Sequence, residues 1–67
     1  MKTVLKISNM VTSNDISKVR SSISRNEGVI AFYIDKDKLE VEVIYDERLL
    51  KVDDMVDSIE KLGYIIV

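Results

Sequence analysis

Apolar and polar residues alternate with a period of two in several parts of the chain. Residues 3–8 and 39–45 place every second side chain on one face, which is typical of strands with one buried side. Residues 29–35 follow the same pattern, and the polar turn at 35–38 joins them to residues 39–45 in a predicted hairpin. A short apolar run at 64–67 predicts a final strand.

Two other segments repeat apolar residues at spacings of three and four, as an amphipathic helix does. The first helix is predicted from Ile16, Val19 and Ile23, which share one face opposite a polar one. The second carries a longer apolar stripe, which comprises Val52, Met55, Val56, Ile59 and Leu62.

The start of the first helix is well marked. Thr12 or Ser13 can cap it, because a hydroxyl there accepts a hydrogen bond from a backbone N–H two or three residues on. If Thr12 is the cap, Asp15 stands at the third helical position, where it completes a capping box and its charge matches the helix dipole. The second helix starts with weaker signals, and Asp53 is the expected cap.

Gly28 and Gly63 end the two helices, and each is followed by an apolar run. The predicted order is therefore strand, helix, strand, strand, helix, strand. This order predicts an α+β chain with the ferredoxin-like βαββαβ arrangement, in which two helices cover one face of a four-stranded antiparallel sheet. No linker or low-complexity segment interrupts the pattern, so residues 1–67 are expected to form a single domain.

Composition narrows the function classes. The 67 residues include no Cys and no His, which removes thiolate ligands, the commonest metal ligand and the usual general base. The formal charge of −2 argues for a soluble protein and against nucleic-acid binding. No apolar run approaches the ~20 residues that span a bilayer, and no signal peptide is evident. We expect a cytoplasmic protein without membrane insertion.

The chain resembles a heavy-metal-associated domain, the domain of bacterial copper chaperones and of the N-terminal modules of copper-transporting ATPases. The resemblance covers nearly the whole sequence. It rests on short motifs at the element ends, namely Asn9-Met10, Gly28-Val29, Ile34-Asp35, Tyr45-Asp46 and the run from Ile59 to Tyr64. Tyr64 is similar to the aromatic residue that bacterial copper chaperones keep beside the metal loop.

The loop departs from the family pattern, which reads Gly-Met-x-Cys-x-x-Cys. Aligned on Met10, this chain has Asn9 in place of the Gly, Thr12 in place of the first Cys and Asp15 in place of the second. Cu(I) is a soft ion that selects thiolate or thioether sulfur, whereas hydroxyl and carboxylate oxygens are hard donors. We expect the replacement of two thiolates by these oxygens to lower the Cu(I) affinity by orders of magnitude. The Met10 thioether remains, but in the family this residue packs beneath the loop.

Two interpretations of the loop remain open. Thr12 and Asp15 form a helix cap with a dipole-matched acid, or Met10, Thr12 and Asp15, with help from Asn14, hold a metal weakly. Tyr64 either packs over the loop or finishes the core with its hydroxyl in water.

Lys18, Ser22 and Arg25 share one face of the first helix, since positions 18 and 25 are seven residues apart. In the family, the loop and first helix meet the partner domain electrostatically. These three residues are therefore candidates for docking a metal-transporting ATPase or another heavy-metal-associated domain, or else form an ordinary solvated face. The acidic second helix also permits weak self-association.

The sequence leaves three alternative functions open. The first is a degenerate metallochaperone-like protein of metal homeostasis that acts as a protein-interaction module, with no cofactor expected. The second is weak or altered metal binding at the loop, with copper as the ion if the family function persists. The third is a small-molecule sensor of the ACT kind. An enzyme is not expected, because the chain has no Ser–His or Cys–His pair and no Gly-rich phosphate loop.

Overall fold

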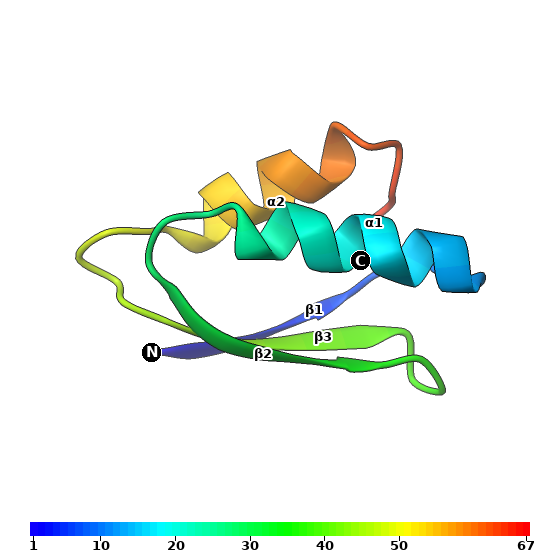
Figure 1. Cartoon of the computed structure of the whole chain (residues 1–67), viewed down its shortest axis with the longest axis horizontal. Helices are drawn as coiled ribbons and strands as arrows, with labels where there is room; N and C mark the ends of the chain where they lie inside the picture. Colours follow the sequence, from blue (N-terminus) through cyan, green and yellow to red (C-terminus); the bar gives the residue numbers. More distant parts are fainter.

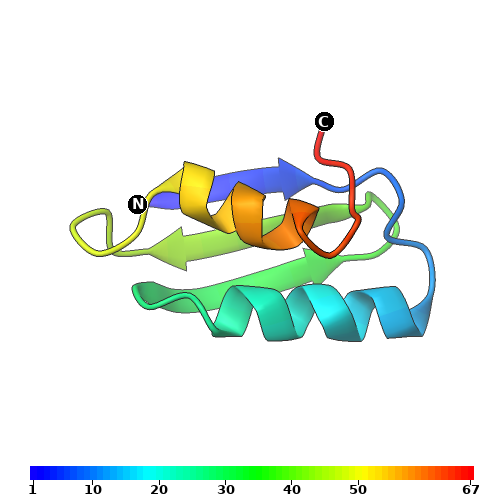
Figure 2. The same ribbon diagram turned by 90° about the horizontal axis from the view of Figure 1, so that it is seen from above.

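The computed structural model describes residues 1–67, and its elements follow the predicted order up to the last segment. The elements are β1 (Lys2–Lys6), α1 (Ser13–Ser24), β2 (Val29–Asp35), β3 (Glu40–Tyr45) and α2 (Val52–Glu60). Figure 1 and Figure 2 show both helices on one face of the sheet, running side by side. Neither helix is long and apolar enough to cross a membrane.

The sheet is antiparallel, and β3 lies between β1 and β2. Its register sets Leu5, Val41 and Ile34 in one row across the three strands, with their side chains directed toward the helices. In β2 the pairing shifts between Val29 and Ala31, which makes a bulge at the beginning of the strand. The period-two pattern therefore predicts the inner face of the sheet correctly.

The expected four-stranded sheet is wrong, because the sheet has three strands. After Gly63 the chain meets the end of β1 only through an isolated antiparallel bridge between Ile7 and Ile66. The antiparallel register explains this, because the residues before Ile66 lie opposite the loop that follows β1, where the Ile65 N–H donates to the Asn9 side chain at 2.9 Å. Only Val67 reaches β1, and its N–H donates to the Lys6 carbonyl at 2.9 Å. The outer edge of β1 consequently has a neighbour only at its end.

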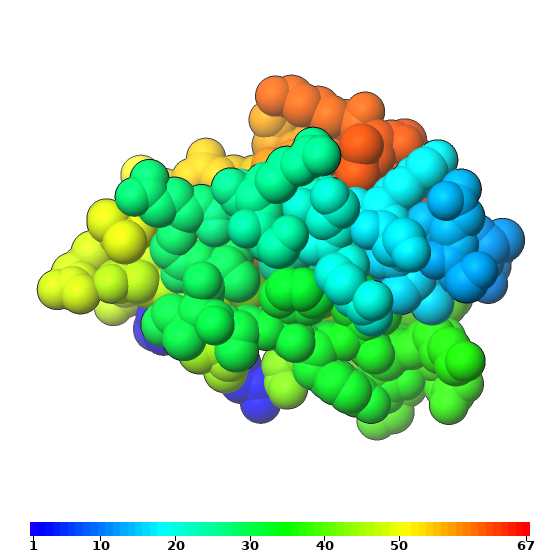
Figure 3. All heavy atoms as spheres, viewed as in Figure 1, coloured from blue at the N-terminus to red at the C-terminus, as the bar shows by residue number.

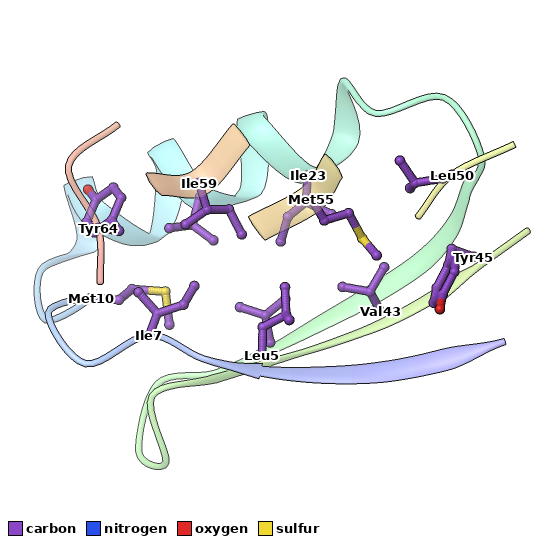
Figure 4. Packing of buried hydrophobic residues seen from close by; sticks show 12 residues of the cluster. Leu5, Ile7, Met10, Ile23, Val43, Tyr45, Leu50, Met55, Ile59 and Tyr64 are labelled. Atoms are coloured by element: carbon purple, nitrogen blue, oxygen red, sulfur yellow. The ribbon is translucent and has the colours of Figure 1, made fainter. Parts of the chain in front are cut away.

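The core fills the space between the sheet and the helix layer, as Figure 4 shows. Its members come from β1, α1, β3, α2 and the segments between and after them, and β2 packs against this cluster through the partly buried Val29, Phe32 and Ile34. The members of the cluster are Leu5, Ile7, Met10, Val19, Ile23, Val41, Val43, Tyr45, Leu50, Met55, Ile59 and Tyr64. Burial of a large apolar side chain contributes about 1.5–3 kcal/mol, so this cluster supplies most of the free energy that favours folding.

The two helix starts differ in how well the sequence marks them. Thr12 is the cap of α1 and forms the expected capping box with Asp15. The expected Asp53 cap of α2 is wrong, because the chain turns from extended to helical backbone at Lys51. The Asp54 carboxylate accepts from the Lys51 N–H at 3.3 Å. Leu50 is buried just before this turn, so core packing sets the point of entry in place of a side-chain cap.

Three boundary predictions also need correction. The first strand ends at Lys6 instead of Ser8, because Ile7 already pairs with the C-terminal segment. Leu39 lies in the turn before β3 with a φ of 56°, in the left-handed region. Leu62 lies beyond the end of α2 and is 46% exposed, so the apolar stripe stops one turn earlier than its spacing suggests.

We predict that Gly28→Ala destabilises the fold more than Gly63→Ala does. Both glycines have positive φ, at 105° and 93°, which costs another residue about 1–2 kcal/mol. A Cβ at Gly28 would also come within 2.9 Å of the Leu50 Cβ, whereas a Cβ at Gly63 meets nothing within 4 Å. Urea unfolding measures both free energies. Equal losses for the two variants would contradict the steric argument.

Candidate functional site: the loop at the start of the first helix

The loop between β1 and α1 is attached to the C-terminal segment by Asn9. The Asn9 amide nitrogen donates to the Gly63 carbonyl at 3.2 Å, and its amide oxygen accepts from the Ile65 N–H at 2.9 Å. The Ser8 N–H adds a bond to the Ile65 carbonyl at 2.9 Å. These contacts set the loop and the last residues of the chain beside each other. Sequence reasoning noted Asn9 only as a departure from the family glycine, because its partners lie more than fifty positions away.

Met10 points away from the loop surface and into the core. Its side chain is completely buried, and Figure 4 shows it beside Ile7 and below Tyr64. Sulfur at this depth fills space between the sheet and the helices, as buried thioethers often do. Met10 therefore takes the inward position that the family resemblance implied.

Thr12 and Asp15 bind each other's backbone. The Asp15 N–H donates to the Thr12 hydroxyl oxygen at 3.1 Å, and the Thr12 N–H donates to Asp15 Oδ2 at 3.0 Å. The Val11 N–H donates to the same carboxylate oxygen at 3.1 Å. The carboxylate thus satisfies two N–H groups that precede the helix and have no partner within it.

Tyr64 completes the arrangement from the other end of the chain. Its hydroxyl donates to Asp15 Oδ1 at 2.7 Å, while its ring is buried in the core. The side chain therefore packs over the loop, and the alternative with the hydroxyl in water is wrong. Both oxygens of Asp15 are engaged, one by the Tyr64 hydroxyl and the other by two backbone N–H groups.

These hydrogen bonds shift the ionisation of both partners. The Tyr64 hydroxyl, followed by the Thr12 and Val11 N–H groups, holds the pKa of the Asp15 carboxyl well below its usual range. Burial, together with the hydrogen bond to Asp15 and its negative charge, raises the pKa of Tyr64 to about 12. The loop therefore contains a charged carboxylate and a neutral phenol at any pH near neutrality.

The three loop positions do not fit Cu(I). The Met10 sulfur is buried, and Thr12 and Asp15 offer only oxygen, which is a poor match for a soft ion. A hard cation fits little better, because it needs about six oxygen ligands and the only carboxylate of the loop is fully engaged. No group of three or more Asp, Glu, His or Cys side chains gathers elsewhere in the molecule.

The heavy-metal-associated domain family matches residues 4–64 of the chain. The chain belongs to this family. The curated relatives include the copper chaperone CopZ of Staphylococcus haemolyticus (strain JCSC1435), which is 33% identical over 61 residues, or 91% of this chain and 90% of that protein.

Solved structures agree on the fold. A CopZ metallochaperone superposes with a TM-score of 0.94 at 28% identity, with complete coverage of both chains. The N-terminal domain of a potential copper-translocating P-type ATPase from Bacillus subtilis, solved in the Cu(I)-loaded state, gives a TM-score of 0.90. Its identity is 23%, and the match covers 97% of this chain and 81% of that one. The heavy-metal-associated fold is thus retained although both loop cysteines are replaced.

The docking candidates of this heavy-metal-associated domain come together in the structure. Lys18, Ser22 and Arg25 line one groove between α1 and α2. Ser22 is buried at its floor, whereas Lys18 and Arg25 are exposed. The groove also includes Ser58 of α2, whose hydroxyl contacts the Asn26 side chain at 3.3 Å. Sequence reasoning missed Ser58, because nothing in the helical pattern indicates its neighbour across the groove.

We predict that Asp15→Asn removes part of the acid sensitivity of this domain. Because its pKa is lower in the folded state, the Asp15 carboxylate stabilises the fold above its unfolded pKa of about 3.9. This stabilisation is lost as the pH falls from that value toward the folded one. The variant should be less stable at neutral pH, and its free energy of unfolding should change less below pH 4.

Asp37→Asn is the matched control, because it removes the same charge from an exposed turn where no hydrogen bond reaches the Asp37 side chain. Thermal unfolding between pH 2 and pH 7 compares both variants with the unaltered chain. Parallel curves for the two variants would contradict the role given to Asp15.

Proposed function

We propose that this heavy-metal-associated domain is a degenerate member of the family, which works in metal homeostasis by binding a protein partner and does not hold Cu(I). The observation that carries the proposal is the engagement of Asp15. Its two oxygens accept three hydrogen bonds from within the chain, at the position where the family has its second cysteine. On this proposal the domain binds and does not catalyse, and it acts in the cytoplasm.

The hydrogen bonds of the loop support a structural role for its oxygen atoms. The loop pattern of the family has two cysteines as its metal ligands. Here the carboxylate crosslinks the loop, α1 and Tyr64 without any ion. A metal at Met10, Thr12 and Asp15 would have to break these hydrogen bonds and expose a fully buried sulfur. The arrangement therefore favours a loop that keeps one conformation in the absence of metal.

A preordered loop is well suited to docking. Binding a rigid surface avoids the entropy cost of ordering it, so more of the contact energy appears as affinity. Beyond the loop, α1 carries the exposed cation Lys18, and the exposed Arg25 is the C-cap at the far end of the helix. Val11 exposes 72% of its surface at the loop itself. We propose that an acidic partner, namely a metal-transporting ATPase or another heavy-metal-associated domain, contacts these residues.

We expect the purified domain to lose Cu(I) to a colorimetric chelator of modest affinity. The variant Thr12→Cys with Asp15→Cys should gain Cu(I) affinity by orders of magnitude, because it restores two thiolates at the family spacing. Thr12→Ser with Asp15→Ser is the matched control, since it differs from the cysteine pair only in oxygen for sulfur. Competition-resistant binding by the unaltered chain would overturn the proposal.

A second experiment tests docking. The 15N-labelled domain is titrated with the metal-free N-terminal domain of the Bacillus subtilis ATPase named above, and amide shifts are mapped. We expect shifts between Met10 and Arg25. Lys18→Glu with Arg25→Glu should weaken the interaction about tenfold or more, because like charges then face each other.

Lys36→Glu with Lys38→Glu is the control for the docking experiment, because it makes the same change of net charge in the hairpin turn. It should leave the affinity within about twofold of the unaltered domain. Shifts that spread evenly over the sheet, or equal losses for the two charge variants, would contradict docking through α1.

A further inference from the structure

A groove of about 410 Å³ runs between α1 and α2 on the helix layer. Figure 3 shows the side chains of α1 (cyan) meeting those at the end of α2 (orange) along this layer. The polar residues that line it are Lys18, Ser21, Ser22, Arg25, Asn26 and Ser58, and Leu62 is the only apolar one. The groove lies apart from Thr12 and Asp15, which do not line it.

The charge in the groove is positive and unpaired. Neither Lys18 nor Arg25 takes part in any of the three ion pairs of the molecule. No carboxylate lines the groove, although α2 is rich in acidic residues. Two acids of α2 that are close in sequence to Ser58 have partners of their own, since Asp57 pairs with Lys61 at 3.1 Å and Asp54 accepts from the Lys51 N–H.

Hydroxyl groups supply neutral donors beside the cations. The hydroxyls of Ser21 and Ser22 make no hydrogen bond within the chain. Ser58 and Asn26 are already bonded to each other, and the Asn26 amide nitrogen donates to the Ser22 carbonyl at 2.9 Å. These two bonds join the end of α1 to the last turn of α2, so the floor of the groove is fixed before any ligand arrives.

The C-terminal end of α1 would ordinarily repel an anion. Here three of its last four carbonyl groups, those of Ser21, Ser22 and Ile23, accept hydrogen bonds from within the chain. The Ser21 carbonyl accepts from the Arg25 N–H at 3.2 Å and from the Ser24 hydroxyl at 3.0 Å. The Ser22 carbonyl accepts from Asn26, as described above. Lys18 and Arg25 carry the only full charges among the residues that line the groove.

The spacing of the cations indicates the size of the ligand. Lys18 and Arg25 are seven residues apart on one helix, which corresponds to about 10 Å along its axis. Both side chains are long, so they can converge on a ligand with two anionic groups but contact a single phosphate less well. Arg forms bidentate bonds with phosphoryl oxygens, and Lys binds them as a point charge.

We propose that this groove binds a small phosphoryl polyanion of the diphosphate class, with Arg25 and Lys18 each holding one phosphoryl group and Ser21 and Ser22 donating hydrogen bonds. The inference does not rest on the docking proposal, although it uses some of the same side chains. Occupation of the groove would cover the cations that a protein partner contacts.

The test uses the whole chain and inorganic pyrophosphate in metal-depleted buffer. Amide shifts of the 15N-labelled protein are followed as pyrophosphate is added, with sodium chloride at matched ionic strength and inorganic phosphate as comparisons. We expect saturable shifts at residues 18–26 and 58–62 with pyrophosphate, about tenfold weaker binding of phosphate, and no saturation with chloride.

Lys18→Gln with Arg25→Gln should weaken pyrophosphate binding about tenfold or more. Arg20→Gln is the control, because Arg20 lies on the same helix but lines a different groove, beside Tyr33 and Asp37. Shifts that match those of chloride, or equal losses for Arg20→Gln and for the double variant, would overturn the proposal. It would also fail if a glutamate-rich peptide caused the groove shifts and pyrophosphate did not. Docking of the ATPase domain is measured separately, so either proposal can fail alone.

Discussion

The carboxylate of Asp15 joins the loop and the start of α1 to the distant C-terminal segment. One oxygen accepts from the backbone at Val11 and Thr12, and the other accepts from the Tyr64 hydroxyl, 49 positions away. The loop conformation, the start of α1 and the place of the C-terminal segment all depend on this side chain. Hydrogen bonds to a charged group are stronger than those between neutral groups, so such a junction can hold a loop that contains no metal.

The replacement of sulfur by oxygen changes the chemistry of the loop while the scaffold stays the same. Two thiolates in this position would repel each other and attract a soft cation. A single carboxylate with a hydroxyl instead finds enough donors within the protein, namely N–H groups and a phenol. The family's fold supplies these donors, because the start of a helix always leaves N–H groups without an internal partner. Here the Asp15 carboxylate accepts hydrogen bonds from these N–H groups, whereas a metal-binding relative has thiolates at this end of the helix.

Much of the fold could be predicted from local patterns. The alternation in β2 and β3 and the Thr12–Asp15 capping box depend on neighbours within a few residues, so spacing alone identifies them. Other features depend on long-range contacts, which no local pattern contains. They are the hydrogen bonds of the Asn9 side chain to the C-terminal segment, the Tyr64–Asp15 bond and the groove with Ser58. The fourth strand was wrong for the same reason, because the register of the C-terminal segment against Ile7 is a long-range contact, and it sets only Val67 against β1.

The three-stranded sheet leaves β1 as an edge strand over most of its length. Exposed edges are sites where sheets of different molecules join and aggregate. Lys2 and Lys6 are both exposed on this edge strand. Lys2 is paired with Glu42 at 2.8 Å, so Lys6 carries the unpaired charge that disfavours pairing of this edge with another sheet. The short C-terminal segment therefore leaves open an edge that a single lysine guards.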